Sequence, residues 1–276
     1  MRVIRTAFPD DLAGNVVVPT MGALHSGHDA LIRRAVEEAR ARSAPTVVTI
    51  FVNPTQFNDP ADLDVYPRTF DEDAAMCERL GVDAIYAPPV DTVYPPGEDI
   101  PVGDLPAIAT EPGLEDRYRP GHLPGVAQVV RRLFVLASPA AACFGEKDWQ
   151  QLRLVSQMSA NEGLGVDILG VPTAREPDGL ASSSRNVHLK GASREQAAAV
   201  SKGLRAAGLE STVELAELTL REVLREAEID FEYATVRDAD TLMPPTESST
   251  SHRALFAGPV GATRLIDNAP WPWDGR

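Results

Sequence analysis

Hydrophobic and polar positions alternate along the first part of the chain in a way that is typical of βαβ units. Short β-branched runs predict strands over residues 16–19, 46–52, 84–87, 140–144 and 166–171. Apolar residues at helical spacing predict helices between them, over residues 28–42, 71–80, 125–136 and 148–161. This alternation indicates a parallel sheet, and such sheets bind ligands beyond the carboxyl ends of their strands.

The pattern changes after residue 172. Two amphipathic stretches predict helices over residues 193–207 and 214–228, and three strand-like runs follow at 231–237, 253–257 and 263–267. We therefore expect an α/β protein in which residues 1–172 form a Rossmann-like parallel sheet domain. Residues 173–276 are expected to form a smaller C-terminal α+β domain, which is entered through a turn-rich segment.

One connection in the first domain is unusually long. Residues 88–124 are rich in proline, glycine and acidic residues, which predicts either a lid or a specialised binding loop. We favour the lid.

Composition and charge narrow the class of protein. The formal net charge of -14 argues against a broad surface for nucleic acid or anionic lipid, because both need positive potential. Cys77 and Cys143 are far apart in apolar surroundings, so we interpret them as core residues rather than as a disulfide or zinc ligands. The sequence shows neither a signal peptide nor a membrane span, and we expect a cytoplasmic protein.

The segment PTMGALHSGH, residues 19–28, leads from a buried strand into the first helix. Gly22 and Gly27 permit close backbone approach, and the helix N-terminus offers unpaired N–H groups to a phosphate. His25 and His28 are three residues apart, so they share one face and can donate hydrogen bonds to charge that grows on a phosphoryl group. A metal site is the weaker interpretation, because no cysteine or carboxylate stands at a suitable spacing.

Further candidates follow other predicted strands. Only three of the 26 basic residues are lysines, and one of them, Lys147, lies just after a strand in FGEKDWQQL. Its compact charge suits a phosphate, while Asp148 is expected to cap the next helix. Gln56 and Gln151 offer uncharged amides that suit a small substrate with hydroxyls and a carboxylate, although each alone could be a surface residue. The hydroxyls and arginine of residues 182–185 could clamp a polyphosphate.

Taken together, these segments resemble a known family. TMGALHSGH is similar to the HxGH signature of the adenylate-forming and nucleotidyl-transferring superfamily. The longer match, with IFVNPTQF, YPRT, FGEKDWQQL, DGLASSSRN and TRLIDN in order, resembles the pantothenate synthetase (pantoate–β-alanine ligase) family over nearly the whole chain. The resemblance implies ATP-dependent ligation of pantoate to β-alanine through a pantoyl-adenylate, with AMP and pyrophosphate as products, by a homodimer.

The resemblance also implies roles for particular residues. His25, His28 and Lys147 are expected to be catalytic. The expected ATP-binding residues are Met21, Gly22, His25, Gly27, His28, Gly145, Glu146, Lys147, Asp148, Ala174, Ser182, Ser183, Ser184 and Arg185. The expected ligands of pantoate and β-alanine are Gln56, Gln151, Asn53, Arg119 and His122.

Magnesium is expected through the ATP phosphates and not through a direct protein ligand. Glu72 and Asp73 open a predicted helix, where acids stabilise the dipole, and their contact with magnesium is left open.

Three departures from the family pattern change the expectation locally. Ser182 stands where methionine or leucine is usual and Ala174 where valine is common, which predicts a more polar adenine pocket and weaker ATP binding. Only a short segment precedes Val16, where relatives usually carry a longer helix, so the first strand and the dimer edge are left open. Two alternatives remain: a nucleotidyltransferase that moves AMP onto a phosphate, and a non-catalytic nucleotide-binding relative.

Overall fold

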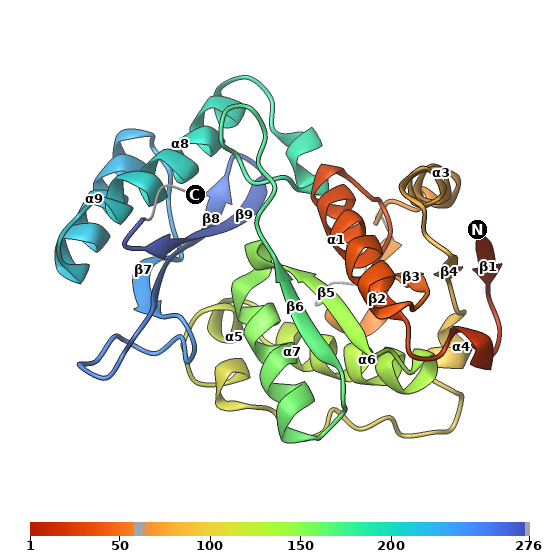
Figure 1. Cartoon of the computed structure of the whole chain (residues 1–276). Helices are drawn as coiled ribbons and strands as arrows, with labels where there is room; N and C mark the ends of the chain where they lie inside the picture. Colours follow the sequence, from red (N-terminus) through yellow and green to blue (C-terminus); the bar gives the residue numbers. More distant parts are fainter. Residues whose placement is uncertain (58–62, 65, 274–276) are drawn as a thin grey trace.

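The larger domain is built on a six-stranded parallel sheet. The structure is a computed structural model that describes residues 1–57, 63–64 and 66–273. The strand order is β1-β4-β3-β2-β5-β6, and every neighbouring pair is parallel. The strands are β1 Arg2–Ile4, β2 Val16–Thr20, β3 Thr46–Ile50, β4 Ala84–Tyr86, β5 Ala141–Gly145 and β6 Asp167–Val171 (Figure 1). The predicted parallel sheet is confirmed, and the strand order reverses direction at β2, where such folds bind ligands.

The sequence pattern missed the edge strand β1. This strand has only three residues, with Val3 opposite Ile85 of β4, and it is too short to show a periodicity.

Helices cover both faces of the sheet. On one face lie α1 Ser26–Arg42 and α3 Phe70–Leu80, and on the other lie α6 His122–Ala137 and α7 Trp149–Asn161 (Figure 1). The alternation along β2 explains these two cores, because Val16 and Val18 pack with α1 and α3 while Val17 packs with α6 and α7. The helices of both layers leave the carboxyl ends of the strands uncovered on the side of the smaller domain.

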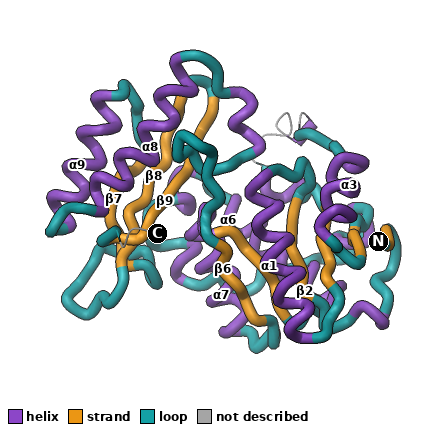
Figure 2. The backbone as a smooth tube through the Cα atoms, turned by 45° about the horizontal axis from the view of Figure 1, so that its top comes forward, coloured by secondary structure: helices purple, strands orange, loops and turns teal. Residues whose placement is uncertain are grey.

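The smaller domain has its own sheet and core. Helices α8 Ala192–Gly208 and α9 Val213–Glu226 pack on an antiparallel sheet of β7 Tyr233–Asp238, β8 His252–Val260 and β9 Thr263–Trp271. Figure 2 shows this domain beside the larger one, with the N-terminus on the far side of the large sheet. The predicted α+β pattern of this part is therefore confirmed.

Most of the long connection is fixed to helix α6. It contains α4 Val90–Val93, the 3₁₀ turn Ala107–Ala109 and α5 Glu115–Tyr118. The side chain of Arg132 donates a 2.9 Å hydrogen bond to the Val93 carbonyl, and that of Gln128 donates to the Ile100 carbonyl at 2.5 Å. None of residues 88–113, all of which the structure describes, lines the cleft described below, so the lid stays a prediction for this part. Only the end of the connection reaches the cleft.

Candidate active site

A cleft of about 260 Å³ opens at the carboxyl ends of β2, β3 and β5. A second cavity of about 240 Å³ continues from it between the two domains. The two cavities share the lining residues Arg119, Lys147, Asp148, Ser183 and Arg185. Most of the predicted site residues line the main cleft: Met21, His25, Gly27, His28, Gln56, Arg119, His122, Gly145, Lys147, Asp148, Gln151, Ala174, Ser182, Ser183, Ser184 and Arg185. The fold thus brings together segments that are far apart in the sequence.

Three predicted site residues, Gly22, Asn53 and Glu146, do not line the cleft, and each has structural contacts instead. Asn53 is fully buried, where its Nδ2 donates to the Gly125 carbonyl at 3.2 Å and its Oδ1 accepts the Tyr94 hydroxyl at 2.8 Å. The Glu146 carboxylate accepts a 2.9 Å hydrogen bond from Arg253 of the smaller domain. Because their polar atoms are bonded within the protein, Asn53 and Glu146 are placed to position the site rather than to face a ligand.

Gly22 forms the turn before helix α1. Its φ angle of 82°, in the left-handed region, suits glycine, and a Cβ there would lie 2.9 Å from the Asp73 carboxylate. That carboxylate, buried on α3, accepts hydrogen bonds from the backbone N–H groups of Ala23 at 3.0 Å and Leu24 at 2.8 Å. Asp73 therefore anchors the turn. Nothing in the local pattern indicates this role, because the partners lie some 50 positions earlier.

The two histidines form the N-terminal cap of α1. His25 is the N-cap, and its Nδ1 accepts the Gly27 N–H at 3.1 Å, while Nδ1 of His28 accepts the His25 N–H at 3.2 Å. The ring centroids are 4.2 Å apart. Since each Nδ1 accepts a hydrogen bond, the proton of each neutral ring is assigned to Nε2, which makes both rings Nε2–H donors.

The electrostatics of the cleft keep these rings neutral. Burial, with a contribution from His25, lowers the pKa of His28 to about 3. Burial and the nearby Lys147 also lower the pKa of His25. At neutral pH the first turn of α1 therefore presents two uncharged donors together with the positive end of the helix dipole.

Lys147 lies in a short turn between β5 and α7. Its ammonium is 3.7 Å from the Asp148 carboxylate. Asn268 of the smaller domain donates to the carbonyls of Glu146 at 2.9 Å and Lys147 at 2.8 Å, so both domains fix the turn. Asp148 occupies the N-cap position of α7, but its side chain caps none of the backbone groups that the structure describes, so the predicted cap is wrong. Its carboxylate instead lines the cleft.

The opposite wall of the cleft carries the amide residues Gln56 and Gln151 and the basic residues Arg119 and His122. Gly125 lets the turn Pro54–Gln56 pack tightly on α6, because a Cβ there would lie 2.5 Å from the Thr55 carbonyl oxygen. Burial, with a contribution from Arg119, lowers the pKa of His122 to about 4. Nδ1 of His122 is buried without a hydrogen-bond partner among the described residues. This wall therefore presents neutral donors and acceptors beside one guanidinium.

The serine loop, residues 182–185, is hydrogen-bonded to the first turn of α1. Ser26 Oγ donates a 3.0 Å hydrogen bond to Oγ of Ser182, which is 5% exposed. Ser183 then caps the 3₁₀ turn Ser184–His188 by accepting the Arg185 N–H at 3.3 Å. The loop that bears Arg185 is thus held beside the histidines.

An apolar wall was not anticipated from the sequence. Val126, Val129, Val130 and Leu133 of α6 line the inner part of the cleft, and Tyr66 lines it too. The helical spacing of the four α6 residues does indicate one apolar face. The pattern cannot show that this face is shared between core and cleft.

The described residues contain no group of three or more His, Cys, Asp or Glu side chains that could hold a metal ion. In the same part of the chain, the structure has no helix of the length and apolar character needed to cross a bilayer.

Comparison with known proteins agrees with the sequence resemblance. The family model for pantoate-beta-alanine ligase matches residues 5–270. A pantothenate synthetase from a Nocardioides species is 45% identical, over 92% of this chain and 78% of that protein. The crystal structure of pantothenate synthetase from Thermus thermophilus is 40% identical with a TM-score of 0.88, covering 98% of this chain and 99% of that one.

A third relative was solved with ligands. The pantoate-beta-alanine ligase from Francisella tularensis, complexed with beta-gamma ATP and beta-alanine, is 30% identical with a TM-score of 0.77. The match covers 98% of this chain and 97% of that one. With a family model that matches almost the whole chain and relatives of this identity and coverage, the chain belongs to the pantoate-beta-alanine ligase family.

Proposed function

We propose that this enzyme joins pantoate to β-alanine with cleavage of ATP to AMP and pyrophosphate, through a pantoyl-adenylate. The observation that favours this chemistry is the pair of neutral Nε2–H donors on the first turn of α1, in one cleft with Lys147 and Arg185. Family membership supports the same overall reaction.

In the first step, a carboxylate oxygen of pantoate attacks the α-phosphorus of ATP, and the bond to pyrophosphate breaks. Both reactants are anions, so the step needs local positive charge and oriented donors. The Nε2–H groups of His25 and His28 are suited to stabilise charge that grows on the phosphoryl oxygens. Lys147 and Arg185 are suited to neutralise the polyphosphate.

Pantoate is proposed to bind on the α6 side of the cleft. Gln56 and Gln151 supply amide groups for hydroxyls and the carboxylate, and Arg119 and His122 complete this side. Val126, Val129 and Val130 of α6 suit the methyl groups of pantoate, because they form the apolar part of the same wall. The nucleotide is proposed to lie toward the serine loop and Ala174.

In the second step, the amine of β-alanine attacks the acyl carbon of the adenylate. The carbon–oxygen bond to AMP breaks, and the nitrogen loses a proton as the amide forms. A cleft that continues between two domains would limit the access of water to the intermediate, which would favour this outcome over hydrolysis.

Three further features belong to this proposal. Magnesium would be held through the ATP phosphates and would supply charge neutralisation there, with Asp148 as the adjacent carboxylate of the cleft. The family resemblance supports a homodimer, which sedimentation would test. The use of ATP supports a cytoplasmic location.

The direct test is pantoate-dependent exchange of labelled pyrophosphate into ATP in the absence of β-alanine. AMP release on addition of β-alanine should follow. Folded protein that shows neither activity would refute the proposal. Mass spectrometry of the products separates the alternatives, because an amide with free AMP indicates the ligase and a dinucleotide-like product indicates a nucleotidyltransferase.

A further inference from the structure

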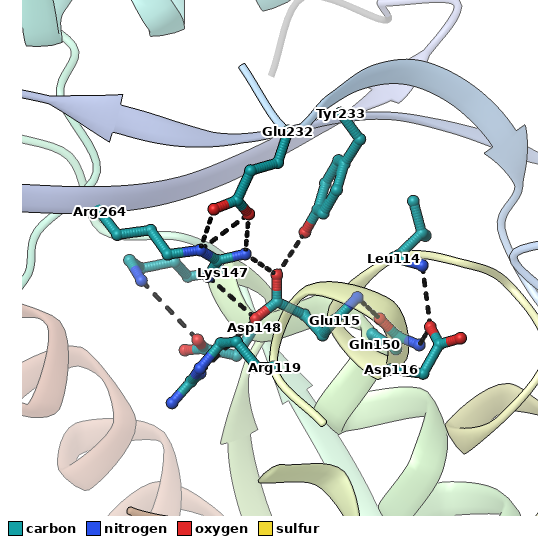
Figure 3. Close-up of polar contacts among 10 residues, drawn as sticks. All are labelled: Leu114, Glu115, Asp116, Arg119, Lys147, Asp148, Gln150, Glu232, Tyr233 and Arg264. Carbon is teal, nitrogen blue, oxygen red and sulfur yellow. Dashed lines mark hydrogen bonds and ion pairs between the residues drawn. The ribbon is translucent and has the colours of Figure 1, made fainter. Parts of the chain in front are cut away.

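Glu115 connects the smaller domain with the cleft. It is the first residue of α5, and its side chain is only 7% exposed. One carboxylate oxygen accepts the Tyr233 hydroxyl at 2.8 Å and Nη2 of Arg264 at 2.6 Å, and the other accepts Nη1 of Arg264 at 3.0 Å (Figure 3). A bidentate carboxylate–guanidinium pair with a third donor in a buried place is strong and geometrically specific.

The contact is charged at neutral pH. Burial would raise the pKa of Glu115, but hydrogen bonds from Arg264 and Tyr233 outweigh it and place that pKa below its ordinary value. Burial and the Glu115 charge hold the pKa of Tyr233 well above its ordinary value, so the hydroxyl remains a donor. Arg264 also binds the Glu232 carboxylate, with the closest atoms 2.6 Å apart. The cluster is therefore ionised and fully paired.

The backbone of Glu115 is fixed from the larger domain. Its N–H donates to the side-chain oxygen of Gln150 at 2.9 Å. The amide nitrogen of Gln150 donates in turn to the Ile108 carbonyl at 2.8 Å. It also donates to the Asp116 carboxylate at 3.1 Å (Figure 3). Gln150 directly precedes the cleft residue Gln151, and Glu115 lies four positions before the cleft residue Arg119. The contact between Gln150 and Glu115 is therefore close in sequence to both cleft side chains.

Arg119 lies one helical turn after Glu115 and lines the cleft. Its Nη1 is 3.5 Å from the Glu115 carboxylate, which is much longer than the contacts that Arg264 makes with the same group. Because better placed donors already occupy that carboxylate, Arg119 is held near it by charge while its own N–H groups remain available. Arg119 faces both cavities.

We propose that Glu115 is a positioning residue, which Arg264 and Tyr233 of the smaller domain hold in place so that Arg119 keeps its guanidinium in the cleft, free to bind the carboxylate of the acid substrate. The placement of the smaller domain and the binding of the acid are thereby coupled. This inference rests on the proposed function and on the proposed role of Arg119.

The first experiment compares Glu115→Gln with wild type in pyrophosphate exchange. The amide keeps the shape of the side chain but lacks the charge that holds Arg119 and Arg264. We expect the KM for pantoate to rise about tenfold and the KM for ATP to stay within about twofold, since one charge-assisted contact is affected. Tyr233→Phe, which removes one donor, should produce a smaller rise of about threefold in the KM for pantoate.

The second experiment tests whether Glu115 acts through Arg119. In an Arg119→Gln background, Glu115→Gln should produce no further rise in the KM for pantoate, because the group it positions is already gone. The matched control is Glu162→Gln, which breaks the ion pair with Arg131 away from the cleft and should leave both KM values unchanged. Thermal unfolding of each variant reports on folding, and Tyr233→Phe replaces Glu115→Gln in the comparison if the latter does not fold.

The outcomes separate the possibilities. Equal rises in the KM for ATP and for pantoate, or effects of Glu115→Gln and Arg119→Gln that multiply, would show a merely structural role and overturn the inference. An unchanged KM for pantoate in Arg119→Gln would overturn it as well. Absence of exchange in the wild-type protein would instead refute the proposed function.

Discussion

The protonation state of two histidines determines what the first turn of α1 can do at the scale of single residues. A backbone N–H points at Nδ1 of each ring, so protonation of that nitrogen would place two N–H groups against each other. This arrangement acts in the same direction as burial, which lowers the pKa of both rings. The rings can therefore donate without first acquiring a positive charge.

The first prediction concerns His28→Ala. We expect the rate of adenylate formation to fall on the order of 10²- to 10³-fold, because one preorganised donor to the transition state is lost. Rapid-quench measurement of pantoate-dependent ATP cleavage reports on this step. His252→Ala, which removes a histidine on β8 outside the cleft, is the matched control and should not affect the rate. An unchanged rate in His28→Ala would contradict the proposed role.

Some properties of single residues could not be predicted from the sequence. The spacing of His25 and His28 was sufficient to predict that they share a site. Their tautomer was not predictable, because it depends on backbone N–H directions that only the folded turn defines. Asn53 and Glu146 lie in the right segments, but their partners are distant in sequence. A motif indicates which segment approaches the cleft and does not indicate which side chains face it.

At the scale of elements, the approach of a short turn to a helix sets the position of Gln56. The turn Pro54–Gln56 rests on α6 at Gly125, where there is no room for a side chain. The Gln56 amide, which lines the cleft, is therefore positioned by a glycine that is not among the lining residues.

The second prediction is that Gly125→Ala displaces this turn. The added methyl group would lie 2.5 Å from the Thr55 carbonyl oxygen, so the turn or the helix must move. We expect the KM for pantoate to rise about tenfold and the stability to fall by ~1–3 kcal/mol. Gly203→Ala is the matched control, because it adds a methyl against a flexible leucine end in the smaller domain. The control should alter stability only, and a normal KM in Gly125→Ala would contradict the prediction.

The third prediction concerns the link between the serine loop and α1. Ser182→Ala and Ser26→Ala each remove the hydroxyl contact that holds this loop. We expect each to raise the KM for ATP about fivefold, which corresponds to ~1 kcal/mol for a neutral hydrogen bond. The double variant should be no worse than either single one, because both remove the same bond. Additive effects in steady-state kinetics would show that the two hydroxyls act separately.

The elements themselves were largely predictable because periodicity is local. Strands β2 to β6 and helices α1, α3, α6 and α7 were anticipated from apolar spacing. Strand β1 was not, because its pairing with β4 depends on an element some 80 residues away. The packing of the long connection on α6 was not predictable for the same reason. Proline-rich composition shows that a segment is irregular, but the bonds that fix it to α6 involve side chains from another element.

At the scale of the whole molecule, both domains contribute to the cleft and the cavity beside it. The larger domain supplies the histidines, the glutamines and Lys147, while Asn268 and Arg264 of the smaller domain fix Lys147 and Glu115. The chain has a net charge of -14, yet the cleft gathers Arg119, Lys147 and Arg185. The composition excluded a broad basic surface but could not reveal this local concentration of positive charge, which results from the tertiary fold.

The last prediction concerns the pH dependence of the free energy of unfolding. Both His28 and His122 have an ordinary pKa of 6.5 when unfolded, and burial lowers these values to about 3 and about 4 in the folded protein. Between these values the unfolded chain binds more protons, so stability should fall as pH decreases below about 6.5. Each histidine contributes a slope of up to ~1.4 kcal/mol per pH unit in this window.

The window between pH 6.5 and 5 separates the histidines from the paired carboxylates. Glu115 also has a lowered pKa in the folded protein, but its stabilising contribution is lost only when the pH falls below its ordinary value of 4.5. Urea unfolding, followed by the emission of Trp149, Trp271 and Trp273, should therefore show decreasing stability over pH 6.5–5 in wild type. His28→Asn, which does not titrate, should have a shallower slope. A wild-type stability that stays constant over this range would show that these rings bind protons equally in both states, and would remove the basis for treating them as neutral donors.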